Sequence, residues 1–428
     1  MFRPSFPGLR HITRRFCTAS STLTSSYVEQ GYFSPEWWLQ SSAPRTVFSA
    51  SSTKDNAVVS VLSRHSRAPA KEEWPKREEW LNKRYAKVTD SGSENCQQEG
   101  FKVIGFEWRT LNYNHDWYQA KVKVVAASRE SEPGSVFLKQ QQKWLYVDNV
   151  QSMVYLGLVT LKSCGYHELP QAMSQKKPIR ILCVGLDGGS VPLYLAHRFP
   201  GATIDIVEID PLIISVTNQE MGFPALPVVT SSGERTFPAD YNNVINKMLW
   251  GDILDRLHLY ENDPAKFLQD TDDVYDMIFI NAYGDGMNDS TSDLCDPDSP
   301  FLKALGDRLH PKHGTVAVNI RWDPDDVDSD DEAPAEEIGQ AYKDALVGDG
   351  SICSSSSPGV GFIYEVDNEN AILVVGRGFI WEEVDPKHHN KDPLTKTLQS
   401  NSLKFHRRLI SNDSSLLVME KKRFTLID

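Results

Sequence analysis

The sequence predicts an α/β protein in which a seven-stranded, mostly parallel sheet ends in an antiparallel hairpin and follows a small antiparallel β meander. From Ile179 onwards, short apolar strands alternate with helical segments, as in a parallel sheet covered by helices on both faces. Nearer the carboxyl end, two apolar strands flank the turn signal Asp367–Asn370, which favours a hairpin. Between residues 101 and 147, three runs rich in Val, Phe, Trp and Tyr are separated by turn residues, which indicates the meander.

The composition limits the classes of protein to consider. The chain has 428 residues, 24% charged and 40% hydrophobic, enough for one large or two ordinary domains. No run approaches eighteen apolar residues, so no membrane span is predicted. The net charge of -13 argues against nucleic acid as a partner, although much of it lies in the acidic loop 323–337. The six cysteines form no CxxC pair and the adjacent His388 and His389 point in different directions, so no metal site is predicted.

The first 28 residues have the composition of an organelle transit peptide. They carry four arginines and no acidic residue, and seven of the nine residues from Thr18 to Ser26 are Ser or Thr. The stretch Arg14–Cys17 resembles a mitochondrial processing site, so we expect mitochondrial localisation, with a plastid as the alternative. A basic tail without a targeting role remains open.

The rest of the chain divides by composition into three parts. Residues 29–98 mix Ser-rich and charged tracts without sustained periodicity, which predicts a poorly ordered linker with short helices. Residues 99–151 form the predicted N-terminal β meander, and 152–428 form the α/β domain, which begins with a buried helix. Within that domain, the long connection 221–256 is either a lid or a surface elaboration.

A glycine-rich loop lies where the first parallel strand passes into a helix. Glycines let a ligand approach the backbone closely, and the start of a helix exposes unpaired N–H groups. The loop lacks the spacing of a NAD fingerprint and the Gly-Lys-Ser/Thr end of a Walker loop. An acidic residue inside it suits a cationic or neutral ligand, and a tight turn of purely structural role is equally open. The predicted ligand-binding residues here are Gly185, Leu186, Asp187, Gly188 and Gly189.

Two acidic residues follow the next two strands. Glu208, with Ile209 after it, lies at the end of the second strand, where a carboxylate can accept both hydroxyl protons of a ribose. The alternative is an exposed carboxylate at a strand end. Asp263 precedes Pro264 and follows the strand near Leu257–Tyr260; it would hold the exocyclic amine of an adenine, cap the following helix, or do both.

The fourth strand ends in polar residues that we expect to border the reacting centre, because ligands of open α/β sheets bind at the carboxyl ends of the strands. These residues are Asn281, Tyr283 and Asp285. The aspartates of the following loop would attract a cationic substrate, or the loop is simply solvated.

These motifs together resemble the class I S-adenosylmethionine (SAM)-dependent methyltransferases, in the branch that contains the spermidine synthases. The resemblance extends from Lys143 to Arg377 and rests on VGLDGGS, VEIDP, ENDPAKFL and YDMIFINAY in that order. It implies a Rossmann-like methyltransferase sheet with SAM as cofactor. The glycine loop would contact the methionine portion, Glu208 the ribose and Asp263 the adenine. It also implies that Gln151, in VDNVQ, lies near the nucleoside.

Departures from the family pattern favour methyl transfer over aminopropyl transfer. Spermidine synthases have an Asp at the position of Asn281, and the resemblance implies that its carboxylate helps to accept a proton from the attacking amine. An amide cannot act as a base or pair with a polyamine cation. Methyl transfer mainly requires alignment of donor and acceptor. We therefore expect an amine-bearing or cationic acceptor, either a protein or a small molecule, and a homodimer is compatible with the sequence. A spermidine synthase-like aminopropyltransferase and a catalytically inactive interaction module remain alternatives.

Overall fold

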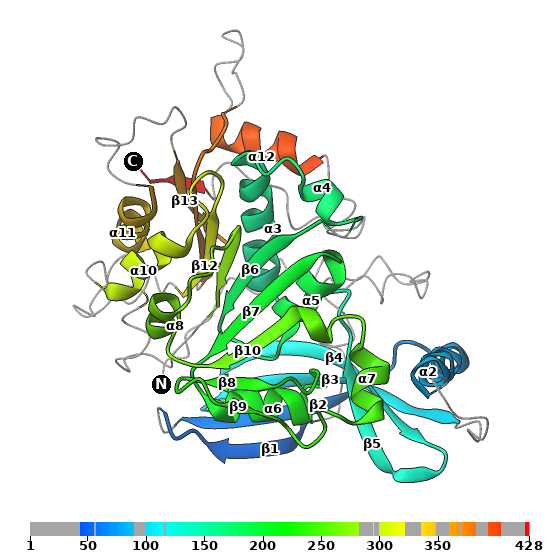
Figure 1. Ribbon diagram of the computed structural model, residues 1–428. Helices are drawn as coiled ribbons and strands as arrows, with labels where there is room; N and C mark the ends of the chain where they lie inside the picture. The colour runs from blue at the N-terminus through cyan, green and yellow to red at the C-terminus, as the bar shows by residue number, and fades with distance from the viewer. Residues whose placement is uncertain are drawn as a thin grey trace, which may run out of the picture.

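The computed structural model describes residues 43–54, 57–89, 100–114, 117–175, 177–281, 294, 299–321, 335–347, 359–367, 370–381, 393–403 and 424–427. They form two sheets, one from the amino-terminal strands and one from the α/β region (Figure 1). The segment 1–28, Tyr283, Asp285, His388 and His389 lie outside these residues, so what was expected of them stays a prediction. No helix among the described residues is long and apolar enough to cross a membrane.

The amino-terminal sheet has five antiparallel strands in sequence order, where three were expected. The expectation of a poorly ordered linker with short helices over 29–98 is therefore wrong for 45–51 and 58–66, which form strands, whereas 71–89 is helical. Val59 and Val61 are buried because their strand pairs with a partner far along the chain, which local composition does not reveal. The strands are β1 (Arg45–Ser51), β2 (Val58–Ser66), β3 (Phe101–Tyr113), β4 (Trp117–Arg129) and β5 (Glu132–Gln140).

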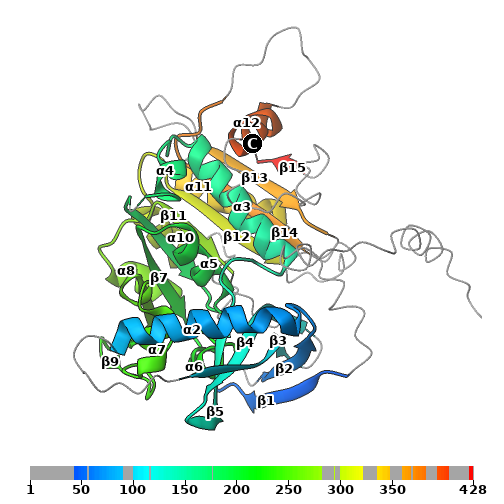
Figure 2. The ribbon, with the colours of Figure 1, turned by 90° about the vertical axis from the view of Figure 1, so that its right-hand side faces the viewer.

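Helix α2 (Trp74–Thr89) lies along this sheet, beside α7 (Val244–Trp250) of the second domain (Figure 2). It is strongly charged and buries only Leu81 among its own residues, so it shows little apolar periodicity. Two of its polar side chains hold it to β3: Glu78 accepts the backbone N–H of Val103 at 3.0 Å, and Asn82 accepts that of Phe101 at 3.1 Å. Polar anchoring explains why the sequence pattern did not predict this helix.

The second sheet has ten strands in the order β15-β13-β14-β12-β11-β6-β7-β10-β8-β9, where seven were expected. The six strands from β12 to β8 are parallel, and the strands at both edges are antiparallel, including the pair β13 and β14. The additions are β8 and β9, from the long connection 221–256, and β15. The strands are β6 (Ile179–Val184), β7 (Ala202–Glu208), β8 (Val228–Thr230), β9 (Arg235–Thr236), β10 (Leu257–Glu261), β11 (Met277–Ile280), β12 (Thr315–Arg321), β13 (Val360–Glu365), β14 (Asn370–Gly376) and β15 (Phe424–Leu426).

Helices cover both faces of the parallel strands, with α3 and α12 on one side of β12 and α8, α10 and α11 on the other (Figure 1). Alternation along the strands divides the core accordingly. Phe279 and Ala317 belong to the apolar cluster that includes α3, whereas Ile280 and Val316 belong to the cluster under α10 and α11. The remaining helices are η2 (Lys71–Glu73), α3 (Asp148–Ser163), α4 (Leu169–Ala172), α5 (Ser190–Arg198), α6 (Pro211–Glu220), η3 (Leu254–Arg256), α8 (Pro264–Asp270), α10 (Pro300–Arg308), α11 (Ala335–Val347) and α12 (Pro393–Leu403).

Two boundaries differ from expectation. The expected end of the meander at 151 falls inside α3, a single buried helix that packs on β11, β12 and β14. The last three residues of the expected acidic loop 323–337 belong to α11, and the others lie outside the described residues. Glu336 and Glu337 thus lie in a first helical turn, where negative charge is favourable.

Helix α3 runs opposite to the parallel strands. Near its end, Thr160 approaches Gly376, which pairs with the first residue of β12. At its start, Asn149 Nδ2 donates to Asn370 Oδ1 at 3.1 Å, beside the last residue of β12. The first turn of α3 therefore lies over the carboxyl ends of these strands, the same end at which the expected site residues lie.

Candidate functional site

The carboxyl ends of four neighbouring parallel strands bring most of the expected site residues together. The strand order β12-β11-β6-β7-β10 places the glycine loop after β6, between the residues that follow β11 and β7. Asn281 donates its backbone N–H to Val184 O at 2.9 Å, and Gly185 donates to Val207 O at 2.8 Å. The backbone hydrogen bonds between strands thus continue to the first residues after β11 and β6 and fix the position of the glycine loop at the end of the sheet.

The glycine loop adopts a backbone that L-residues rarely take. Its φ angles are +90° at Gly185, +46° at Asp187 and +73° at Gly189. Asn and Asp tolerate this region better than other side chains. Asp187 is also held from behind, because Thr217 Oγ1 on α6 donates to its carbonyl oxygen at 2.5 Å. The loop is therefore a rigid turn that presents the Asp187 carboxyl toward β11.

The space beside Gly188 and Gly189 is filled by the protein itself. A Cβ on Gly188 would lie 2.9 Å from Ala120 Cβ on β4 and 3.0 Å from Met221 Cε, and one on Gly189 would overlap the Phe223 ring. At these two positions glycine is required because neighbouring side chains occupy the space of a Cβ, which agrees with the alternative that the loop is a tight turn of structural role. Contact of their backbone with a ligand stays a prediction. The amino-terminal sheet supports the loop directly through β4.

Glu208 ends β7 and is buried, with 8% of its surface exposed, so the alternative of an exposed strand-end carboxylate is wrong. Its Oε2 accepts the N–H of Leu186 and its Oε1 that of Asp210, both at 2.9 Å. Burial raises the pKa of Glu208 to about 7, against the opposing effect of these backbone bonds. Ile209, which lies between Glu208 and Asp210 in the chain, is half-buried. A carboxylate has about four lone-pair sites, so the Glu208 carboxylate retains capacity for a ligand hydroxyl beyond its backbone bonds.

A chain of side-chain hydrogen bonds crosses the strand ends from the glycine loop to β12. Asn281 Nδ2 donates to Asp187 Oδ2, and Asn319 Nδ2 donates to Asn281 Oδ1 at 2.7 Å. Burial, and then the charge of Glu208, raise the pKa of Asp187 well above its ordinary value, while the bond from Asn281 opposes the rise. An acidic residue in place of Asn281 would bring a second carboxyl group against that of Asp187. The amide of Asn281 instead donates a hydrogen bond to the Asp187 carboxyl.

Asn319 was not predicted from the sequence. It lies near the end of the apolar strand TVAVNIR, where an isolated polar residue is the signal that could have identified it. Sequence alone gives such a residue no partner; the register, which sets Ile280 beside Val318, brings it next to Asn281.

Asp263 follows β10, the strand beside β7. Its Oδ1 accepts the N–H of Lys266 at 2.8 Å, which confirms the expected helix cap, and Pro264 occupies the first position of α8. Glu208 O accepts the N–H of Asn262 at 3.1 Å, so Asp263 lies one strand beyond Glu208. That order matches a ligand extending from the loop across β7 to β10.

Gln151 lies in the first turn of α3, at the same end of the sheet. Its Nε2 donates to Leu145 O at 2.8 Å, so its amide nitrogen already holds the segment that enters the helix. That the side-chain oxygen of Gln151 contacts a nucleoside stays a prediction.

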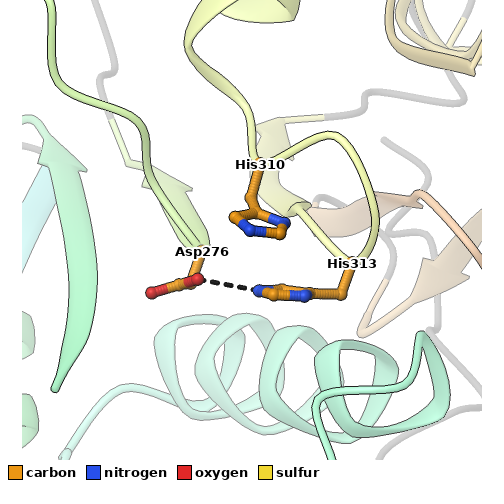
Figure 3. Close-up of side chains that lie close together, drawn as sticks. All are labelled: Asp276, His310 and His313. Carbon is orange, nitrogen blue, oxygen red and sulfur yellow. Dashed lines mark hydrogen bonds and ion pairs between the residues drawn. The ribbon is translucent and has the colours of Figure 1, made fainter.

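One group of possible metal ligands occurs among the described residues, at the opposite end of β11 (Figure 3). Asp276 Oδ1 and His313 Nε2 form a hydrogen bond of 2.7 Å, and the ring of His310 stacks on that of His313 with centroids 3.7 Å apart. Burial and His313 lower the pKa of His310. A metal ion binds imidazole nitrogen in the ring plane, and two stacked rings do not share a plane. We therefore assign this group to packing of the turn before β12.

Comparison with known proteins shows similarity to two kinds of transferase. No family model matches the chain. It is 50% identical over 46 residues to the human and mouse eEF1A lysine and N-terminal methyltransferases, which covers 11% of this chain and 7% of theirs. It is 36% identical over 78 residues to the polyamine aminopropyltransferase of Vibrio vulnificus, covering 18% of this chain and 24% of that one. The match thus spans under a quarter of the length of these relatives.

Similar solved structures are methyltransferases and spermidine synthases. Human methyltransferase-like protein 13 in complex with S-adenosylhomocysteine (SAH) is 18% identical, with 63% of this chain and 98% of that chain covered and a TM-score of 0.38. Spermidine synthase from Thermotoga maritima is 10% identical, with 85% and 87% covered and the same TM-score.

Proposed function

We propose that this chain is a SAM-dependent methyltransferase that acts on an amine. The observation that carries the proposal is the group formed by Glu208, Asp187 and Asn281 at the carboxyl ends of three adjacent strands. A ligand crevice is expected at that place in an open α/β sheet. The short matches to a protein methyltransferase and an aminopropyltransferase support a transferase that uses a SAM-type donor.

The residues present fit such a donor. Glu208 would accept the ribose hydroxyls with the lone pairs that its backbone bonds leave, and Asp263 would face the adenine from the next strand. Asp187 offers a carboxyl that burial and Glu208 keep from ionising easily, so a nearby cationic group would stabilise its charged form. When bound, SAM supplies an activated methyl group on a sulfonium.

The chemistry of Asn281 favours methyl transfer. Its amide already donates to Asp187 and accepts from Asn319, so it orients groups at the strand ends and takes up no proton. Methyl transfer to a neutral amine requires in-line alignment, which rigid amides provide. Aminopropyl transfer is the second candidate, favoured by the match to the Vibrio vulnificus enzyme.

Thermal unfolding with separate donors tests the proposal. We expect SAM and SAH to stabilise the protein, by about 2.7 kcal/mol at one hundred times the dissociation constant. Stabilisation by decarboxylated SAM alone would show an aminopropyltransferase instead. If SAM binds, methyl-labelled SAM is incubated with a mitochondrial extract, the source that the amino-terminal composition recommends. Binding without any enzyme-dependent label on protein or small amines would favour the inactive interaction module.

The affinity for SAH is expected to rise with pH. The pKa of Glu208 is about 7, and its ionised form is the better acceptor for two hydroxyl groups. Between pH 8 and pH 6 the ionised fraction falls about tenfold, so the dissociation constant should rise about tenfold. The free energy of unfolding of the ligand-free protein should change in the opposite direction. A carboxyl group whose pKa is raised by folding contributes stability that is lost as pH rises through that pKa, here about 7.

Calorimetric titrations with SAH at several pH values measure this effect, since proton release on binding appears as a dependence on buffer ionisation heat. Glu208→Gln, which does not titrate, serves as the control and should remove most of the slope. An affinity that is the same at pH 6 and pH 8 would contradict the assigned role of Glu208.

A further inference from the structure

Asn319 carries a buried hydrogen-bond acceptor that finds no partner among the residues that the structure describes. The residue has 5% of its surface exposed, and its Oδ1 has no hydrogen bond within the described part of the chain. Its Nδ2 is engaged with Asn281 Oδ1 at 2.7 Å, which fixes the orientation of the amide. Because a buried carbonyl without a donor is costly, native proteins rarely retain one without a reason.

The position of this acceptor relates it to the proposed reaction. Strand alternation puts Asn281 and Asn319 on the same face as Phe279 and Ala317, under α3. The first turn of α3 lies over the same strand ends, and Asn281 connects Asn319 to Asp187 of the glycine loop. Asn319 Oδ1 is therefore separated only by the Asn281 side chain from the glycine loop, which would hold the donor.

We propose that Asn319 Oδ1 receives an N–H of the amine that is methylated, and so selects nitrogen nucleophiles. This inference rests on the proposed function. An amine attacks the methyl carbon with its lone pair while the carbon–sulfur bond breaks and its electron pair stays on sulfur. A primary or secondary amine still has an N–H for Asn319 during the attack, and the ammonium product releases a proton to solvent. A hydroxyl that has lost its proton would instead meet the negative end of the amide dipole.

Two analogues of the donor separate this contact from donor binding. Sinefungin carries a primary amine on carbon in place of the methylated sulfonium, whereas SAH has a bare sulfur there. Dissociation constants of both are measured by calorimetry for the wild type, Asn319→Leu and Asn319→Asp. Leucine keeps the branched outline of the side chain but removes both the acceptor and the donor to Asn281. Aspartate keeps the acceptor, lacks that donor and adds charge. The measured quantity is the ratio of sinefungin to SAH affinity, which a general loss of stability does not change.

We expect Asn319→Leu to lower this ratio about tenfold or more, as for loss of a hydrogen bond to a charged group, and Asn319→Asp to raise it. Asn246→Leu is the matched control, because Asn246 is buried in α7 with its amide bonded to Ala225 and Tyr241. It should leave the ratio unchanged. If Asn319→Leu does not fold, the ratio for Asn319→Asp decides.

The outcomes separate the two levels of the proposal. If SAH binds and neither Asn319 variant changes the ratio, the contact is refuted while the donor site stands. If the wild type binds neither analogue, the proposed function fails, and the role of Asn319 falls with it.

Discussion

Replacing Glu208 by alanine is expected to weaken SAH binding at least 100-fold. Two hydrogen bonds from ribose hydroxyls to a charged acceptor contribute about 1.5–3 kcal/mol each, and 2.7 kcal/mol already corresponds to a factor of about 100. The same substitution leaves the N–H groups of Leu186 and Asp210 without their acceptor, which loosens the glycine loop and the start of α6. Both effects act in the same direction, and calorimetric titration with SAH measures their sum.

Two further variants show whether the effect is specific. Glu208→Gln retains one carbonyl oxygen for a backbone N–H and should lose binding by about tenfold. Glu261→Ala is the matched control, because Glu261 pairs directly with Glu208 on the neighbouring strand β10 yet lies outside the proposed contacts. It should change the affinity less than twofold. Equal losses in Glu208→Ala and Glu261→Ala would show that the strand ends, and not the carboxylate, matter.

Gly189→Ala is expected to destabilise the fold by about 4 kcal/mol. The φ angle of +73° is unfavourable for alanine by about 1–2 kcal/mol, and a Cβ there would overlap the Phe223 ring. Overpacking of this kind adds about 1–3 kcal/mol, because a dense interior cannot shift freely. Urea unfolding followed by circular dichroism measures the free energy of unfolding.

Gly233→Ala separates the two causes. Gly233 has a similar φ of +81° in the connection before β9, but a Cβ there would meet nothing within 4 Å. Its substitution should cost about 1 kcal/mol, the backbone contribution alone. Adding Phe223→Leu to Gly189→Ala should recover part of the loss. Similar losses for the two glycine variants would show that the contact with Phe223 carries no energy.

The packing around the glycine loop makes the amino-terminal sheet part of the site. Ala120 on β4 touches the position of Gly188, and the backbone of Gln140 at the end of β5 lies against Gly222. Arg109 on β3 pairs with Glu220 at the end of α6 at 3.0 Å. These contacts come from residues that precede the motif-bearing region, so the amino-terminal sheet packs directly against the glycine loop and α6.

Prediction from sequence succeeded where neighbouring residues decide the structure. The apolar runs of β6, β7 and β10, the turn after β6 and the cap at Asp263 follow from hydrophobic pattern, glycine and capping chemistry within a few residues. It failed for β1, β2 and α2. The strands become buried only against distant partners, and the helix is held by polar contacts of Glu78 and Asn82.

The sequence by itself determined that parallel strands alternate with helices and that acidic and amide residues stand where those strands end. Tertiary structure alone decided that Glu208 is buried with both oxygens on backbone N–H groups, and that Asn281 joins Asp187 to Asn319. The reason is physical: a strand's pattern is local, whereas burial, pKa and hydrogen-bond partners depend on which strands lie side by side. That arrangement is set by packing across the whole sheet.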